Sequence, residues 1–476
     1  MNERDARGRV REAGGIELVE RLDHLDRVRS QGVPRDRAVT APDQSATPDF
    51  DVLIAGGGLS LLYAPLLAAR GLRVAIADRA RVGEAHREWN ASRPELEALV
   101  RAGLCSQPEL DDQLIVARYR TGVCRWHRGG EYPVRGVLDC AVDAGALLTL
   151  ARVRAQERGV TILDRAALVG VGAGPRAVAA TLSSEGREFT VTARVLVDAR
   201  GAASPHASAD LVCPTVGGSL SGLQSGTAPD QVAADEGEIL VTTEDIEDGR
   251  QHVWEAFPGR RDRVTIYLFH YAEVSRDAGA LLSLYARFFE RLPSYKRGSF
   301  TLERPTFGFI PGWSRLTPAP QSPHPRIVLV GDAAGRHSPL TFCGFGATLR
   351  SLESGCREIE RALESGARAG LVVDDRDVHT ATGALALLLA RPPKNPARAG
   401  ALNSLLDAAF ASIHALGEQA YGELLRDELP LSVFVDFLRS TARREPSVYA
   451  HVLRTLGPRL SLAWGANLAR ALIAAR

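Results

Sequence analysis

The sequence predicts an α/β fold that joins a Rossmann-like dinucleotide-binding domain to an inserted antiparallel sheet and a helical C-terminal region. Three observations predict it. A strand, a glycine turn, a helix and a second strand follow one another from about residue 50. Residues 213–324 are dominated by alternating or β-rich runs, and residues 371–476 have mostly helical apolar spacing.

The glycine turn is the most informative stretch. Residues 52–55 form a short apolar run typical of a buried parallel strand, and Gly56 and Gly58 supply a tight turn before an Ala- and Leu-rich helix over 59–70. The strand that follows this helix ends at Asp78. In such a unit the helix N-terminus and the bare glycine backbone hold a pyrophosphate, while the acid binds a ribose hydroxyl.

The turn departs from the G-x-G-x-x-G pattern at its third glycine, where Leu61 stands. That glycine normally allows close packing of helix on strand, so we expect a slightly wider crossing here. The alternative is an ordinary glycine turn of an α/β protein. Because strand, turn, helix and acid occur in order, dinucleotide binding is the favoured interpretation.

Composition and charge exclude several classes of protein. The chain has 476 residues, of which 45% are hydrophobic, and a net charge of +1. It is long enough for two or three packed units and offers no electrostatic case for binding nucleic acid. The six cysteines are scattered without metal-ligand spacing, which disfavours a zinc site or a disulfide scaffold. Because no signal-peptide pattern or long apolar run occurs, we expect a cytoplasmic protein, with peripheral attachment to a membrane left open.

The pattern along the chain predicts four regions. Residues 1–49 form a charged extension with one candidate amphipathic helix in otherwise loose chain. The other three are a discontinuous dinucleotide-binding domain, a β-rich substrate domain and a helical C-terminal region. Their predicted ranges are 50–212 with 325–370, 213–324, and 371–476.

Within the first domain we expect further helices and strands. Helices are predicted over 94–104, which begins with a proline, and over 143–159, which an acid opens and a glycine closes. Short strands are predicted at 137–139 and 160–163. The strand over 193–198 runs into a glycine turn, as expected of a chain that re-enters the first sheet.

The polar segment after Asp78 carries further candidates for cofactor binding. Arg79, Arg87 and Asn90 follow the acid that should hold the ribose, so we expect them to reach the cofactor. The alternative, a solvated loop that buries Trp89, is about equally favoured.

A second glycine motif, Gly331-Asp332, follows an apolar strand over 326–330. Asp332 can accept a hydrogen bond from a polyol hydroxyl. The loop beyond it carries Gly344 and Gly346 before a helix whose N–H groups face a ring that must bear negative charge. Taken alone, Gly331-Asp332 would be an N-cap. Together with the early glycine turn and a midway Asp-x-x-Gly, it completes a three-part pattern that predicts FAD binding.

The three-part pattern resembles the glutathione-reductase-type fold of flavin monooxygenases, geranylgeranyl reductases and lycopene cyclases. A narrower likeness lies in these stretches: Arg87-Glu-Trp-Asn-Ala-Ser-Arg-Pro-Glu-Leu96, Val253-Trp-Glu-Ala-Phe-Pro258, Ile266-Tyr-Leu-Phe269, Phe307-Gly-Phe-Ile-Pro311, Gly331-Asp-Ala-Ala-Gly335, Ser338-Pro-Leu-Thr-Phe-Cys-Gly-Phe-Gly346 and Leu424-Leu-Arg-Asp427. They resemble the CruA/CruP type of lycopene cyclase and its paralogues. The likeness covers roughly residues 50–476 and is specific to the family but not to one member.

The resemblance implies a membrane-associated flavoprotein that acts on a carotenoid or a similar hydrophobic polyene such as lycopene. It implies a redox-neutral cyclisation: an end group is protonated, the carbocation closes a ring, and a proton leaves, with reduced FAD required but not consumed. An anionic reduced flavin and a carboxylate in an apolar pocket would stabilise the cation. The helix predicted over 460–472 is a candidate for membrane-surface contact, although burial against the protein is the commoner fate of such helices.

Our candidate for the catalytic acid is Glu255, in a strand-like run of the domain expected to cover the flavin. The acid must be protonated to start the reaction, so burial that raises its pKa would help. Strand alternation places Glu255 opposite Trp254, so both side chains cannot face one pocket. The alternative is a surface or salt-bridged glutamate. Glu273 and Asp332 are weaker candidates for the acid, and His337 is a candidate flavin contact.

Other functions stay open. An FAD-dependent oxidoreductase, a monooxygenase or a polyene reductase, would need a hydride supply such as NAD(P)H and, for oxygenation, an open channel to the flavin. A paralogue that binds a carotenoid without turnover is the third possibility. A flavin halogenase is disfavoured because the W-x-W-x-I-P motif is absent and neither lysine stands in a halogenase-like context. Consumption of NAD(P)H in step with product would favour the oxidoreductase, and bound pigment without product would favour the paralogue.

Overall fold

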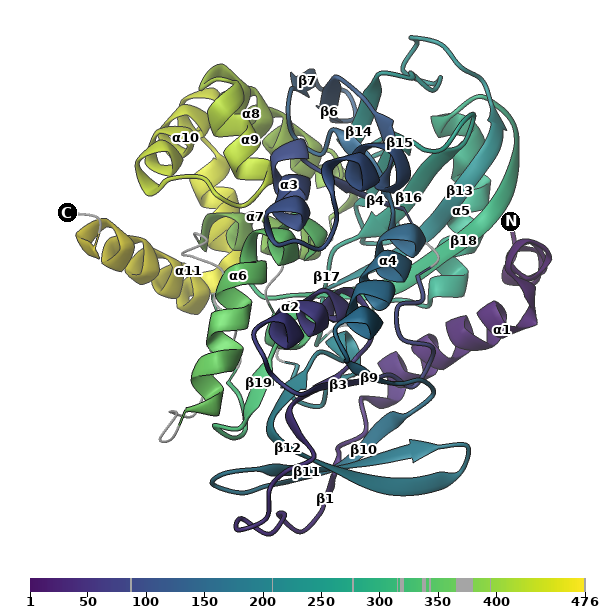
Figure 1. The fold of residues 1–476 in the computed structure, drawn as a ribbon. Helices are drawn as coiled ribbons and strands as arrows, with labels where there is room; N and C mark the ends of the chain where they lie inside the picture. The colour runs from purple at the N-terminus through teal and green to yellow at the C-terminus, as the bar shows by residue number, and fades with distance from the viewer. Residues whose placement is uncertain are drawn as a thin grey trace.

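The first sheet has a parallel core that continues into an antiparallel ribbon. The computed structural model describes residues 1–85, 88–207, 209–275, 278–314, 316, 321–335, 340–341, 344–364, 380–393 and 395–474. The order of the sheet is β1-β10-β11-β12-β2-β3-β9, and β19 pairs with the end of β12. Its strands are β1 (Arg37–Ala38), β2 (Phe50–Ala55), β3 (Val74–Ala77), β9 (Thr161–Leu163), β10 (Ala167–Ala173), β11 (Val178–Ser184), β12 (Arg187–Asp198) and β19 (Ile327–Leu329). Figure 1 shows the ribbon of β10, β11 and β12 at the lower edge of the molecule in that view.

The predicted strand–turn–helix–strand unit is present. After β2 the chain forms a tight turn of 3₁₀ helix, η1 (Leu59–Leu62), which runs into α2 (Tyr63–Ala69) and then β3. Both strands are parallel neighbours in the sheet. Leu61, which replaces the third glycine, is fully buried in the core beneath this sheet.

A small antiparallel sheet, β4-β8-β5, shares a hydrophobic core with the first sheet. It consists of β4 (Glu88–Ala91), β5 (Ile115–Arg118) and β8 (Cys140–Asp143). The predicted strand at 137–139 is wrong. Gly136 and Leu138 have positive φ angles of 66° and 49°, so the chain turns there and becomes extended only at Cys140.

The two helices predicted in this part of the chain are confirmed. Helix α3 (Arg93–Arg101) starts with a capping box, in which Ser92 and Glu95 satisfy each other's backbone N–H groups. Helix α4 (Ala144–Glu157) is capped by Asp143, whose side chain accepts from the Ala146 N–H.

The second sheet is mostly antiparallel, as predicted, with the order β17-β13-β16-β15-β14-β6-β7 and with β18 paired to β13. Its strands are β6 (Thr121–Arg125), β7 (Glu131–Val134), β13 (Leu211–Leu223), β14 (Glu236–Val241), β15 (His252–Pro258), β16 (Val264–His270), β17 (Ala272–Glu273) and β18 (Gly298–Gly312). Strands β6 and β7 come from the range 50–212 and yet extend this sheet through β14. The range 50–212 therefore contributes strands to both sheets, and the predicted domain boundaries stay a prediction.

Helix α5 (Leu281–Tyr295) covers one face of the second sheet. Trp254 of β15 stacks on Tyr295 with ring centroids 4.6 Å apart. The Tyr285 hydroxyl donates to the carbonyl oxygens of Gly217 and Thr306, each at 2.9 Å. Aromatic packing and these two bonds fix the helix against β13, β15 and β18.

The N-terminal extension differs from the expectation of mostly loose chain. Helix α1 (Glu3–Gln31) occupies most of it and packs on α5 and β18 (Figure 1). Ala6, Val10 and Leu22 are buried in that contact, which gives the segment a tertiary reason to be helical. A positive φ of 78° at Gly15 kinks the helix.

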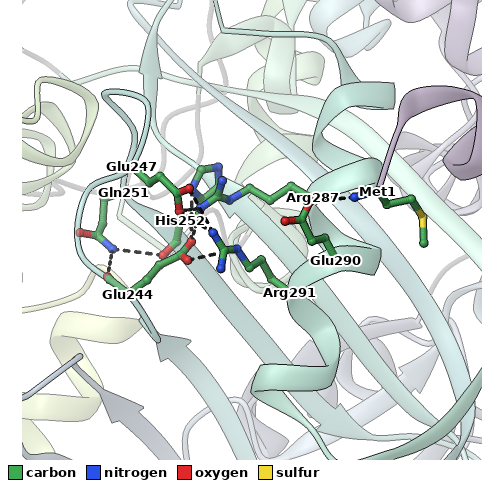
Figure 2. A network of polar contacts seen from close by, with 8 residues as sticks. All are labelled: Met1, Glu244, Glu247, Gln251, His252, Arg287, Glu290 and Arg291. Carbon is green, nitrogen blue, oxygen red and sulfur yellow. Dashed lines mark hydrogen bonds and ion pairs between the residues drawn. The ribbon is translucent and has the colours of Figure 1, made fainter.

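A polar network ties α5 to the connection between β14 and β15 (Figure 2). Arg287 pairs with Glu244 at 2.6 Å and with Glu247 at 2.5 Å, and Arg291 pairs with Glu247 at 2.8 Å. His252 lies beside Glu244, and burial holds its pKa well below the ordinary value, so the imidazole is neutral. The network therefore holds α5 to this connection.

The C-terminal region is helical, as predicted. Its helices are α6 (Gly344–Leu363), α7 (Thr380–Ala390), α8 (Ala401–Ala415), α9 (Glu418–Leu425), α10 (Leu431–Arg444) and α11 (Val448–Ala474). Helix α11 bends at Gly457, where φ is 73°, and extends away from the other helices toward the C-terminus (Figure 1). Within the described residues, no helix has the length and hydropathy needed to span a membrane.

Arg200 joins the first sheet to the segment that follows α1. Its guanidinium binds both oxygens of Asp36, at 2.7 and 2.8 Å, and both oxygens of Asp198, at 3.0 and 2.8 Å. Asp198 is fully buried at the end of β12. Burial alone would raise the pKa of Asp198, but the Arg200 hydrogen bonds and charge outweigh burial and lower this pKa.

Replacing Arg200 with Met should destabilise the protein by about 3 kcal/mol, because it leaves two carboxylates without their counter-charge and one of them buried. Urea denaturation measures the loss. Arg37→Met is the control: its pair with Glu188 is exposed on both sides, and its loss should cost about 1 kcal/mol or less. Equal effects of the two substitutions would contradict the assignment.

Candidate functional site

The glycine turn after β2 is shaped by close backbone contact and by Asp78. Gly56 has a φ of 118°, and a Cβ there would lie 2.3 Å from the Ala199 carbonyl oxygen. The Gly57 N–H donates to Oδ2 of Asp78 at 2.6 Å. Gly58 differs, since a Cβ there would meet no atom within 4 Å. The turn is therefore tight on its inner side and open at Gly58.

Asp78 lies where the sequence placed it, at the end of β3, but its first role is to hold the turn. Its Oδ1 accepts the Ala80 N–H at 2.7 Å, while its Oδ2 accepts the Gly57 N–H. Each carboxylate oxygen can accept a second hydrogen bond, so the predicted ribose contact remains compatible with these bonds.

The second glycine motif lies at the same edge of the sheet. Gly331 and Asp332 begin the short helix η4 (Gly331–Ala334), which follows β19. The Cβ position of Gly201, in η3 (Gly201–Ala203), is 3.4 Å from Oδ2 of Asp332. Because β2, β12 and β19 are parallel, the three segments that follow them meet at one edge.

Gly344 and Gly346 stand in the first turn of α6, as predicted. A Cβ at Gly346 would lie 2.5 Å from Oε1 of Glu95, so this glycine lets α6 approach α3 closely. Arg350 of α6 pairs with the same carboxylate. Gly346 therefore has a packing role, and its predicted cofactor contact stays a prediction.

The predicted cofactor contacts of Arg79, Arg87 and His337 stay predictions. Nη1 of Arg79 lies 3.2 Å from Nε2 of His24 on α1. Arg87 and His337 lie outside the described residues.

Asn90 and Glu255, predicted for different roles, are in contact. Nδ2 of Asn90 donates to Oε1 of Glu255 at 2.7 Å. Two more bonds dock β4 on the second sheet: the Tyr267 hydroxyl donates to the Glu88 carbonyl oxygen at 3.0 Å, and the Thr265 hydroxyl donates to Oε2 of Glu88 at 2.8 Å. Asn90 therefore binds the candidate acid.

Strand β4 also lies at the start of α6. Trp89 packs against Phe345, with ring centroids 4.7 Å apart. The Asn90–Glu255 pair is thus held between the second sheet and the strand that contacts the N-terminal turn of α6. This is the part of the fold at which the sequence placed the charged ring of the cofactor.

The face of β15 that carries Glu255 is apolar and aromatic. Glu255 is opposite Tyr267 in the β15–β16 register, and Val253 and Phe257 share its face. Trp254 points to the other face, against α5. The predicted separation of Glu255 from Trp254 is confirmed.

The Glu255 side chain is largely enclosed by protein. Burial raises its pKa to about 7, and the Asn90 hydrogen bond opposes that shift. Burial and then the Glu255 charge also raise the pKa of the Tyr119 phenol. A carboxyl group of this kind exchanges its proton near neutral pH, which suits a general acid.

The weaker candidates for the acid have other contacts. Glu273 forms an ion pair with Arg391 of the chain that follows α7. Asp332 stands beside η3, as described above. No motif in the sequence points to Tyr119, which precedes β6. It comes close to Glu255 only in the folded structure, where separate strands are brought together.

The raised pKa of Glu255 predicts a pH-dependent stability. Between its ordinary value of 4.5 and about 7, the folded protein keeps a proton that the unfolded chain releases. The free energy of unfolding should therefore fall as pH rises through this window, by about 3 kcal/mol at most. Glu255→Gln lacks this proton exchange, so its stability relative to the unmodified protein should rise between pH 5 and pH 8 in urea denaturation. A constant difference would contradict the raised pKa.

Comparison with known proteins identifies the fold. No protein-family model and no curated protein matches the sequence. Among solved structures, the halogenase PltM in complex with phloroglucinol and FAD is 13% identical, with a TM-score of 0.58 over 89% of this chain and 96% of that chain. A geranylgeranyl bacteriochlorophyll reductase-like protein from Thermoplasma acidophilum is 14% identical, with a TM-score of 0.54 over 86% and 98%. The p-nitrophenol 4-monooxygenase PnpA from Pseudomonas putida DLL-E4 is 15% identical, with a TM-score of 0.53 over 85% and 99%. The predicted fold class is thus confirmed: the chain has the α/β fold that these three proteins share.

Proposed function

We propose that the chain is an FAD-dependent enzyme and that FAD binds at the edge where the three glycine segments meet. The residues present fit this group. The open space at Gly58 adjoins the start of η1, whose first N–H groups no side chain caps, so a pyrophosphate has both room and donors. Asp78 keeps acceptor positions for a ribose hydroxyl. The solved structure of PltM, which has the same fold, contains FAD.

The reaction that the site supports best is the redox-neutral cyclisation of a lycopene-type polyene. One observation carries this proposal: Glu255, with a pKa of about 7, lies on the apolar face of the second sheet. A polyene has no hydrogen-bonding group, so it needs an apolar wall and one strong proton donor. A carboxyl group that is partly protonated at neutral pH meets the second need.

The side chains around Glu255 have distinct roles in this proposal. Asn90 orients the carboxyl group through Oε1, and proton transfer to an end group of the polyene leaves a carboxylate that the same amide stabilises. The rings of Phe257 and Tyr267 share the face of Glu255 and are placed to stabilise a carbocation. When bound in its reduced form, FAD would supply negative charge that stabilises the carbocation on the polyene.

An FAD-dependent oxidoreductase is the second candidate. It is favoured by the fold shared with a reductase-like protein and a monooxygenase. Halogenation is less favoured, although PltM is a halogenase, because Lys296 is buried in an ion pair with Glu238 at 2.9 Å and donates to two backbone carbonyl oxygens. The third possibility, a paralogue that binds a carotenoid without turnover, is distinguished by the expression experiment described below.

Peripheral membrane contact through the second half of α11 is part of the proposal, because a lycopene-type substrate resides in lipid. Leu462 and Ile473 are three-quarters exposed. Residues 446–474 contain no acid and carry Arg459 and Arg470, which suits an anionic lipid surface.

The glycine turn makes a prediction about cofactor binding. Gly58→Ala should leave the stability of the apoprotein within about 1 kcal/mol but abolish flavin binding, because the new methyl group enters the space kept for the pyrophosphate. Gly56→Ala should lower stability as well, because its Cβ would overlap the Ala199 carbonyl oxygen. Flavin absorbance after reconstitution and thermal unfolding of the apoprotein measure the two effects. Full flavin binding by Gly58→Ala would contradict the proposed site.

Expression in a lycopene-accumulating bacterial host tests the reaction, with pigments separated by chromatography. We expect γ- or β-carotene from the unmodified chain and a loss of about 100-fold or more in Glu255→Gln, because the proton donor is gone. The matched control is Glu236→Gln, another partly buried glutamate of the same sheet whose pKa burial also raises.

Two results would overturn the cyclase proposal. Unchanged lycopene beside flavin-loaded protein would exclude it, and NAD(P)H consumption or bound pigment would then select between the two alternatives. Equal loss in Glu236→Gln and Glu255→Gln would remove Glu255 as the acid.

A further inference from the structure

A cavity of about 770 Å³ opens beside the Glu255 cluster. Its wall is formed by the turn between β5 and β6, the first residue of α3, and the chain after β7. The side chains that matter below are Arg93, Arg118, Arg120, Arg135, Tyr119 and Asp139. This volume is large enough for a ligand of nucleotide size.

The wall of the cavity is strongly basic, with four arginines and one aspartate. Asp111, Asp235 and Glu418 pair with these arginines but do not line the cavity. Within the described part of the chain, Arg118, Arg120 and Arg135 each make a single ion pair. Each guanidinium has five N–H donors, so most of them are available to an anion.

The pairs at the rim are weak enough to admit a competing anion. The side chains of Arg120 and Arg135 are 83% and 75% exposed, and Arg135 is 3.9 Å from Glu418. Exposed pairs of this kind contribute about 1 kcal/mol or less. An anion that binds several guanidinium groups at once gains bidentate hydrogen bonds that these single pairs do not provide.

The turn that carries the arginines is held by its backbone. The Tyr119 N–H donates to the Asp139 carbonyl oxygen at 3.0 Å, and the Arg120 N–H donates to the Asp235 carbonyl oxygen at 2.9 Å. The Tyr119 ring lies against Gly237, where a Cβ would come within 2.3 Å of the ring. Arg118 and Arg120 are therefore presented from a fixed turn.

Tyr119 is common to the cavity and to the Glu255 cluster. It is 4% exposed and belongs to the cavity wall, and burial and then the Glu255 charge raise the pKa of its phenol. Its buried hydroxyl interacts with the side chain of Asn90, which also binds Glu255.

We propose that this cavity binds an organic phosphate, with the phosphate groups on Arg118, Arg120 and Arg135 and the organic part toward Tyr119. The proposal rests on the proposed function in one respect, the role of Glu255 behind Tyr119. Two sources have this chemistry: a nicotinamide nucleotide that reduces the flavin, and a substrate that carries a diphosphate on a prenyl chain.

Calorimetric titration of the flavin-loaded full chain with NADPH and, separately, with farnesyl diphosphate tests the proposal. We expect one of the two to bind, with an affinity that falls at high ionic strength. The double substitution Arg118→Gln and Arg120→Gln should weaken binding about tenfold or more. Arg128→Gln is the matched control: its side chain is 77% exposed, makes one ion pair in the described chain and lies outside the cavity wall, so the affinity should not change.

The outcomes separate the sources and the proposals. Binding of NADPH identifies the cavity as a reductant site, and binding of farnesyl diphosphate identifies it as a substrate site. Failure of both to bind, or equal binding by the double variant, overturns the inference. If the double variant does not fold, Arg135→Gln replaces it, with an expected weakening of about threefold. Glu255→Gln should bind like the unmodified chain, so failure of the cyclase proposal would leave this result intact.

Discussion

The register between β2, β12 and β19 is the constraint on which the site depends. Ala55, Asp198 and Leu329 lie side by side at the ends of these parallel strands. The chain must leave the sheet at that line, and each segment does so through a glycine with a positive φ: Gly56, Gly201 and Gly331. A shift of one residue would turn the buried residues of a strand to the opposite face and would separate the three glycine turns.

The two faces of the second sheet have different roles: one packs against α5, and the other carries the candidate site. One face carries Trp254 and the aromatic side chains of α5, and the polar network of Figure 2 closes that side around Arg287 and Glu244. The other face carries Glu255 and Tyr267 toward β4. Because side chains alternate along β15, a single strand supports both the packing of α5 and the candidate site. The neutral His252 belongs to the α5 side, so it does not compete with Glu255 for a proton.

Local sequence patterns predicted the elements that depend on interactions between residues close together in the sequence. The βαβ unit, the capped helices and the opposite orientation of Glu255 and Trp254 follow from apolar spacing, capping residues and the two-residue period of a strand. The contact between Asn90 and Glu255 could not be predicted, because it joins positions 165 residues apart and depends on how β4 docks on the second sheet. The strand expected at 137–139 failed because Leu138 adopts a backbone conformation that nothing in its residue type indicates. The cavity could not be predicted either, because its arginines come from segments that are far apart in the sequence.

The bond from Asn90 to Glu255 also couples two equilibria. The amide donates to the carboxyl group and so favours its charged form. By thermodynamic reciprocity, the free energy by which the docked strand lowers this pKa is the same free energy by which ionisation of Glu255 tightens the docking of β4. Loss of the Glu255 proton therefore stabilises the docking of the small sheet on the second sheet. The protonation state of Glu255 in this way affects the packing around it.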